Sequence, residues 1–203
     1  STTELDVMPP EGAAARSRRE TRRRLVEAGT ELFARDGLHG ATSARIARRA
    51  GVAAGTFYLH FKDKQQLFRE IVFAALAEMR SRQDRAAADV PRGGTLEVRA
   101  RYRVLLQVAE ENRSLIRVLF GRGPAAADLG EEMLDSLVPG IEERLRERAA
   151  SGEAHGLHAA AAAQAIVGMV TRVIGWWAED PTRAPREDVV ETLTRLHPIR
   201  PRG

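Results

Sequence analysis

Hydrogen-bond donors gather between residues 42 and 64, in the stretch TSARIARRAGVAAGTFYLHFKDK. The stretch offers hydroxyl, phenol, imidazole, guanidinium and ammonium groups, all of which can donate to phosphate oxygens. The longer side chains among them can also reach the edges of bases. These donors alternate with apolar residues at helical spacing, so the local secondary structure decides which of them face outward.

Two short helices joined by a tight turn account for this spacing. A hydroxyl at Thr42 or Ser43 can cap the first helix by accepting an orphan backbone N–H bond. Gly51 then enters a left-handed turn without the penalty that a Cβ atom would bring. A second helix is expected from about Ala53. Helix, glycine turn and short helix form the helix-turn-helix pattern, whose second helix enters the major groove of DNA.

The apolar residues around this turn predict a small core that holds the second helix in place. A preceding helix is expected from Ser17, which fits a capping box with Glu20, to about Asp36. The predicted core comprises Leu25, Leu32, Phe33, Ile46, Val52, Phe57 and Phe61. Tyr58 and His60 lie off this apolar face, so we expect both to point outward.

Composition limits the classes of protein that fit. A chain of 203 residues suits one large or two small domains. It has no cysteine, which excludes a disulfide framework, a thiolate nucleophile and a thiolate metal site. No apolar run resembles a membrane span, and the N-terminus lacks the apolar core of a signal peptide. A cytoplasmic location without membrane partners is therefore expected.

Positive charge is concentrated at the start of the chain. Residues 12–64 hold ten arginines and two lysines against five acidic residues, a net charge of +7, whereas the whole chain carries +4. Neutralising phosphates supplies most of the non-specific affinity for DNA, so a basic first quarter suits a DNA-facing module. A solvated arginine-rich surface is the alternative that charge alone leaves open.

The periodicity of the whole chain predicts an all-α fold of about nine helices in two domains. We expect a disordered arm at 1–15, a three-helix helix-turn-helix domain at 16–63, and a helical ligand-binding and dimerisation domain at 64–203. Asp63 and Gln66 fit a capping box that opens a helix connecting both domains.

Within the second domain, turn residues separate the expected helices. Breaks are predicted at 89–94, 121–124 and 152–156, and Pro139 is expected to kink the helix at 126–150.

The helix expected at 157–179 is apolar on nearly all sides. Such a helix must be buried nearly all round, and a second copy of the chain is a natural source of the extra burial. The candidate anchors of this dimer interface are Ile166, Val170, Val173, Trp177 and Leu193. Alternatively, this face packs only within its own subunit.

Residues from about Thr21 to Phe68 resemble the DNA-binding domain of the tetracycline-repressor (TetR) family of transcriptional regulators. The resemblance rests on ELFARDGLHGATSARIARRAGV, GTFYLHF and KDKQQLF in the expected order and spacing. It implies a repressor that binds a palindromic operator as a homodimer and is released when a small-molecule effector occupies the C-terminal domain. Beyond residue 70 only the coarse all-helical layout carries over.

The resemblance also implies which residues touch DNA. The positions that match phosphate-contacting positions of the family are Thr42, Ser43, Tyr58, His60 and Lys64. At the positions of Ala44 and Ala54, family members often carry long polar side chains, and at Ala53 a serine that would cap the helix. What remains near the groove is Arg45, Ala54, Gly55, Thr56 and the ring of Tyr58.

Arg45 is the one long donor in that set that could reach guanine, although a phosphate contact explains it equally well. We therefore expect an operator with few strongly fixed bases, read partly through DNA shape.

Other chemistry is weakly supported by the sequence. His155 and His158 are three residues apart but lack further ligands, so neither a metal nor a cofactor is expected. No nucleophile–base set or phosphate-binding glycine loop suggests an enzyme. Candidate effector-binding residues are Tyr102, Arg117, Arg172 and Trp176, each explained as well by an ordinary core or surface position. An activator and a ligand-independent, nucleoid-type DNA-binding protein remain the alternative functions, and the sequence names neither effector nor operator.

Overall fold

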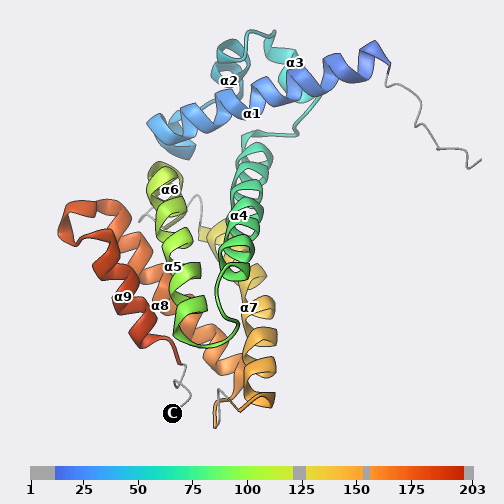
Figure 1. Cartoon of the computed structure of the whole chain (residues 1–203). Coiled ribbons are helices and arrows are strands. Elements are labelled where there is room, and N and C mark those ends of the chain that lie inside the picture. Colours follow the sequence, from blue (N-terminus) through green and yellow to red (C-terminus); the bar gives the residue numbers. More distant parts are fainter. Residues whose placement is uncertain (1–11, 121–126, 153–155, 199–203) are drawn as a thin grey trace, which may run out of the picture. The chain divides into compact units, whose positions relative to one another are not determined.

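The computed structural model describes residues 12–120, 127–152 and 156–198, and in these ranges every regular element is helical (Figure 1). The α-helices, in chain order, are α1 (Ala13–Gly40), α2 (Ser43–Arg49), α3 (Ala54–Tyr58), α4 (Lys64–Ala88), α5 (Gly94–Glu111), α6 (Arg113–Phe120), α7 (Ala127–Ala150), α8 (Ala159–Glu179) and α9 (Arg186–Leu196), with the short 3₁₀ turn η2 (Pro181–Arg183) before α9. The predicted all-α class is confirmed. The predicted break at 121–124 lies outside the described residues.

Contacts divide the chain into two compact units, residues 1–68 and 69–203. The division falls inside α4, slightly beyond the boundary at 63/64 that the sequence suggests. The first turn of α4 belongs to the N-terminal unit because the ring of Phe68 packs edge-to-face on Phe33, with centroids 5.0 Å apart. One continuous helix therefore contributes residues to both units.

Helix α1 begins earlier than the sequence predicts. Its first residue is Ala13 and its N-cap is Gly12, so the expected arm at 1–15 is too long by its last three residues. Alanine has the highest helix propensity, which explains a start within the alanine run. Ser17 then lies inside the helix, and the predicted capping box is wrong. Residues 1–11 lie outside the described part of the chain.

The end of α1 and the small core agree with the sequence pattern. Gly37 has φ +71°, a left-handed conformation that breaks the regular helix before the chain turns into α2. Six of the seven predicted core residues are buried, and Val52 is half-buried. Edge-to-face and tilted ring contacts among Phe33, Phe57, Phe61 and Phe68 add to this core.

The C-terminal unit is built around α8, which packs against α5, α6 and α7, while α9 packs along α5 (Figure 1). Its larger cluster contains Val98, Tyr102, Leu106, Ala109, Ile174, Trp177, Val189, Val190 and Leu193. A second cluster joins Leu145 of α7 to Ala163 and Ile166 of α8. Helix α7 continues through Pro139 rather than ending there.

Helix α8 is long and apolar enough to cross a membrane, judged by length and composition only. The expectation that no apolar run reaches this length is therefore wrong. The same helix supplies Ile166, Ile174 and Trp177 to the cores of its own unit, and a core helix passes the same test.

Candidate DNA-binding surface and effector cavity

Helices α2 and α3 are held at their predicted positions by a cap and a turn. The Thr42 side chain caps α2, its Oγ1 accepting from the backbone N–H of Arg45 at 3.2 Å. Gly51 has φ +68° between the two helices, as the left-handed turn requires. The guanidinium of Arg24, on α1, donates to the carbonyls of Ala50 and Gly51 and so fixes this turn from the side. The sequence pattern did not identify Arg24, because its partner lies 26 residues away.

Helix α3 presents small side chains and one aromatic ring. Its N-cap, Ala53, makes no side-chain cap bond, as expected from the missing serine. Ala54 and Gly55 are exposed and Thr56 is half-buried. Tyr58 is 62% exposed and its ring leans edge-on against the buried ring of Phe57, with centroids 5.4 Å apart. The outward direction predicted for Tyr58 is confirmed, whereas His60 is half-buried.

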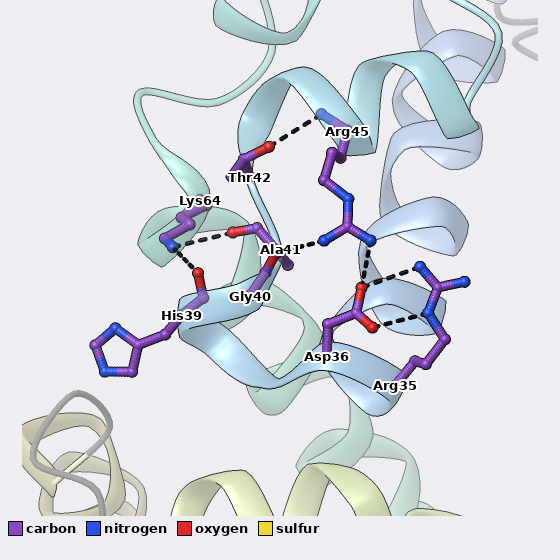
Figure 2. Close-up of polar contacts among 8 residues, drawn as sticks. All are labelled: Arg35, Asp36, His39, Gly40, Ala41, Thr42, Arg45 and Lys64. Atoms are coloured by element: carbon purple, nitrogen blue, oxygen red, sulfur yellow. Dashed lines mark hydrogen bonds and ion pairs between the residues drawn. The ribbon is translucent and has the colours of Figure 1, made fainter.

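Arg45 does not present a free guanidinium to DNA. Its Nη1 donates to the carbonyl of Gly40 at 2.6 Å, and its Nη2 donates to the Asp36 carboxylate at 2.6 Å (Figure 2). Both partners lie at the end of α1, so the side chain lies back along the protein. Two of the five N–H donors of Arg45 are thus engaged within the protein, and in this conformation the guanidinium is directed at the end of α1. A contact from Arg45 to guanine or phosphate stays a prediction that would require these bonds to be given up.

Asp36 is held in its charged form by two arginines. Arg35 donates to it through Nε and Nη2 at 2.8 and 3.0 Å, in addition to the contact from Arg45. These bonds, the one from Arg35 first, lower the pKa of Asp36 to about 2, because each favours the carboxylate over the acid.

Lys64, the first residue of α4, closes the same turn from the other side. Its Nζ donates to the backbone carbonyls of Leu38 at 2.7 Å, Ala41 at 3.0 Å and His39 at 3.4 Å. Figure 2 shows the ammonium directed at the carbonyls of His39 and Ala41. An ammonium has three protons, and here all three have backbone acceptors. The phosphate contact expected from this ammonium does not fit the geometry.

A basic hollow lies beside the helix-turn-helix. Arg18, Arg19 and Arg22 of α1 line it with His60, around a volume of about 300 Å³. Burial, followed by the charges of Arg18 and Arg22, lowers the pKa of His60. Arg18 and Arg22 are four residues apart and share a helix face, a signal that the sequence carried. The hollow thus gathers three guanidinium groups and an imidazole on one side of the N-terminal unit.

The C-terminal unit contains a cavity of about 380 Å³ between α4, α5, α7 and α8. Of the candidate effector-binding residues, Tyr102 lines it, whereas Arg117, Arg172 and Trp176 do not. Trp176 is 39% exposed, with the Arg183 guanidinium 5.8 Å above its ring. All three side chains are exposed, so this cavity gives no support to their role in effector binding, which stays a prediction.

The cavity also contains a residue that the sequence analysis did not identify. His197, just after α9, shares a 2.7 Å hydrogen bond between its Nδ1 and the hydroxyl of Tyr102. Burial, then the charges of Arg148 and Arg144, lower the pKa of His197 to about 4. Burial also raises the pKa of Tyr102. Both groups are therefore neutral at pH 7 and line the cavity wall as hydrogen-bonding partners.

The residues expected to anchor a dimer are engaged within their own chain. Trp177 is 1% exposed and Leu193 is fully buried, both in the larger core cluster, and Ile166 is buried in the second. Val170 and Val173 are half-buried against the same clusters. Their role as dimer anchors stays a prediction, because apolar periodicity marks a buried face without saying which chain covers it. The exposed residues of α8, which we name its outer face, are Ala161, Gln164, Ala165, Gly168, Arg172, Trp176 and Glu179.

Comparison with known proteins accords with the geometry of the N-terminal unit. Residues 25–71 match the family described as bacterial regulatory proteins, tetR family. The chain belongs to the tetR family.

Its similarity to other members is highest in the DNA-binding region. This tetR-family chain is 27% identical over 137 residues to the uncharacterised HTH-type transcriptional regulator YhgD of Bacillus subtilis. The aligned region covers 63% of this chain and 69% of YhgD. It is 42% identical over 52 residues to the HTH-type transcriptional regulator AcrR of Shigella flexneri, covering 26% of the chain and 24% of AcrR. These relatives are transcriptional regulators.

Solved structures share the fold over nearly the whole length. A putative TetR-family regulator from Syntrophomonas wolfei matches with a TM-score of 0.75 at 16% identity, covering 88% of this chain and 93% of that one. The transcriptional regulator FadR from Bacillus subtilis, in complex with stearoyl-CoA, matches with a TM-score of 0.70 at 21% identity, covering 87% and 97%. These structures show the shared fold, whereas the family match and the curated relatives show that the chain is a helix-turn-helix transcription regulator.

Replacing Lys64 tests whether its ammonium holds the α1–α2 turn. Lys64→Met leaves three backbone carbonyls without their donor, so the free energy of unfolding should fall by about 1–3 kcal/mol. Lys62→Met removes the same charge from an exposed side chain and serves as the control. Thermal unfolding followed by circular dichroism compares the two. Equal stability of both variants would contradict the clamp.

The His197 site predicts a pH dependence of stability. Unfolded histidine takes up a proton near pH 6.5 but folded His197 only near pH 4, so the folded state loses stability as pH falls through this window. The loss should be on the order of 2–3 kcal/mol. His197→Phe should flatten the dependence, and the exposed His39→Phe should not. Denaturant titrations at pH 7 and pH 4.5 make the comparison, and a wild-type curve already flat over this range would refute the assignment.

Proposed function

We propose that this chain is a homodimeric repressor that binds a palindromic operator in the cytoplasm and leaves it when a small molecule occupies the cavity of the C-terminal unit. The family supports this reading, since its regulators bind DNA and small-molecule effectors. The solved FadR structure with stearoyl-CoA is one such complex, although at 21% identity it shares only the fold with this chain.

The observation that carries the proposal is the double role of α4. Its first residue, Lys64, holds the α1–α2 turn, and Phe68 packs in the DNA-binding core. Fifteen to twenty residues further along the same helix, Met79, Gln83 and Asp84 line the cavity. A ligand that shifts α4 would therefore also shift the support of α2 and α3. Only a ligand that binds the shifted state better can move the population away from DNA.

A two-fold dimer would determine the symmetry and spacing of the operator. Two recognition helices about 34–36 Å apart would meet successive major grooves on one side of the duplex. With Arg45 engaged by Asp36, the outward surface of α3 consists of Ala54, Gly55, Thr56 and Tyr58. Small side chains can pack on thymine methyl groups but cannot form the paired hydrogen bonds that identify a purine.

Selection of bound sequences from random DNA tests this function. Wild type should return a near-palindrome with few strongly fixed bases per half-site, and small molecules from a release screen should dissociate that complex. Ala54→Arg should change which bases are selected. Arg45→Ala should lower the melting temperature while the selected bases stay the same, because its guanidinium supports the α1–α2 turn.

Other outcomes of the selection point to the alternatives. Random DNA bound as tightly as any selected site would favour a nucleoid-type protein. Higher expression of a reporter when the protein occupies the selected site would favour an activator. New base preferences in Arg45→Ala would show that this side chain reads DNA after all.

The dimer is proposed to form through the outer face of α8 together with α9. In the most apolar part of α8 only 22% of the residues are fully buried, and four of the exposed ones, Ala161, Ala165, Gly168 and Trp176, are apolar or small. Ala161, Ala165 and Gly168 allow a second helix to approach closely, and Trp176 offers a large ring at the end of the row. Leu196 of α9 is also exposed and would extend the contact.

A charge on the outer face of α8 should separate the subunits. Ala165→Glu would place an unpaired carboxylate in the proposed contact, so it should shift the protein to monomers at micromolar concentration. Leu96→Glu puts the same charge on an exposed apolar position of α5 and should leave dimers intact. Light scattering after size-exclusion chromatography distinguishes them. A wild type that is monomeric in this assay would contradict the proposed dimer.

A further inference from the structure

Two further cavities of opposite character adjoin the central cavity of the C-terminal unit. One, of about 110 Å³, has an almost entirely apolar wall that includes Val72, Leu76, Ile116, Leu119 and Met133. It shares Met79, Leu105, Leu137, Val170 and Thr171 with the central cavity. The other, of about 580 Å³, shares Asp84, Arg101, Arg144 and Arg148 with it. The hollow space between α4, α5, α7 and α8 therefore has an apolar end and an arginine-rich end.

Most arginines at the charged end already have partners. Arg101 pairs with Asp84 at 2.9 Å and with Glu97 at 3.1 Å. Arg148 pairs with Glu97 at 3.3 Å, so that one carboxylate serves two guanidinium groups. The central cavity is thus lined by Arg80, Arg101, Arg144 and Arg148 against the single carboxylate of Asp84. The wall carries an excess of positive charge.

Arg144 stands out within this group. It is half-buried, and among the residues that the structure describes no carboxylate or carbonyl lies within bonding distance of its guanidinium. Burial, followed by the charge of Arg101, lowers the pKa of Arg144, which is the signature of a cation whose charge is poorly compensated. Burying a charge without a partner is costly, so buried arginines are normally paired. An anion in the cavity would supply the missing partner.

We propose that the effector is an amphipathic anion, with an apolar chain in the cavity beside α6 and a carboxylate or phosphate head group bound by Arg144 and Arg148. This rests on the proposed function, in which the cavity is the effector site. The planar guanidinium suits both head groups, since it binds carboxylate and phosphate through paired N–H donors. The neutral Tyr102–His197 pair lines the space between the two ends and offers hydrogen bonds without adding charge.

Binding of defined probes to the full chain tests the chemical class. Isothermal titration calorimetry measures the binding of four probes, each below its micelle concentration. The probes are palmitate, palmitoyl-CoA, coenzyme A and hexadecyltrimethylammonium. Palmitate or palmitoyl-CoA should bind, and the cation, with the same chain length, should not. If both palmitate and palmitoyl-CoA bind, a carboxylate head group is sufficient for binding. If only palmitoyl-CoA binds, the arginines bind the phosphate groups of the head group. Failure of both anions to bind, or equal binding of the cation, would overturn the proposal.

Matched variants assign the head-group role to Arg144. Arg144→Gln should weaken binding of the anion roughly tenfold or more, because it removes a charged hydrogen bond. Arg146→Gln, two residues along α7, removes an exposed charge that pairs with Glu142 and should bind as wild type does. The melting temperature of Arg144→Gln should not fall, since the lost charge has no partner in the structure. Unchanged affinity in Arg144→Gln would overturn its role.

A second variant examines the apolar end. Ala75 lines the apolar cavity, so Ala75→Phe should weaken palmitoyl-CoA more than octanoyl-CoA by filling the space that the longer chain needs. Equal loss for both chain lengths would contradict this placement of the chain. The two proposals fail separately. If a ligand of another chemical class releases the protein from operator DNA, the repressor function is supported and the anionic effector is rejected. If an anion binds the cavity but the DNA complex stays intact, the ligand class is supported and the proposed response to it is rejected.

Discussion

The structure of the N-terminal unit depends on how the carbonyls at the end of α1 are satisfied. A helix ends with several carbonyls that have no intrahelical donor, and a buried one without a partner is costly. Here Lys64 supplies its ammonium to three of them and Arg45 supplies its guanidinium to a fourth, while Asp36 neutralises Arg45. Three charged side chains, from α1, α2 and α4, thus meet at one turn. The orientation of α2 and α3 follows from a set of charged hydrogen bonds as well as from the phenylalanine core.

The second constraint is the placement of arginine in the C-terminal unit. A small helical unit gains little from burying guanidinium groups, and a cavity wall with four of them against the carboxylates of Asp84 and Glu97 would be better packed if it were apolar. Such an arrangement is expected where binding, rather than stability, determines the residues. The same α4 that starts with Lys64 forms one side of that cavity, so ligand affinity and the support of the α1–α2 turn are properties of one helix.

The sequence predicted most of the fold because the fold follows from local patterns. Apolar periodicity, Gly51 and the break at 89–94 located the helices, and of the two capping hydroxyls predicted, Thr42 or Ser43, Thr42 caps α2. Partners far apart in the sequence could not be predicted in this way. Nothing local indicates that Lys64 bonds to carbonyls 23–26 residues earlier, or that Tyr102 meets a histidine 95 residues later. Likewise, Trp177 and Trp176 are adjacent in sequence, but Trp177 is buried and Trp176 is exposed. Apolar periodicity could not distinguish them, because the helix is apolar on nearly all sides.

The departures from the sequence expectations lead to a more specific account of DNA recognition. A DNA contact was expected from Lys64 through the resemblance to the family and from Arg45 through the length of its side chain, yet here both side chains serve the turn. Further positive charge gathers in Arg18, Arg19 and Arg22 of α1 beside His60. The groove-facing helix, in turn, is left with Ala54, Gly55 and Thr56, which contribute shape and close approach rather than hydrogen bonds to bases. We infer that positioning on the backbone and reading of the bases fall to different helices, α1 and α3. In the proposed function, selectivity then depends on how readily the operator adopts the shape that brings its phosphates to α1 while the small residues of α3 lie in the groove.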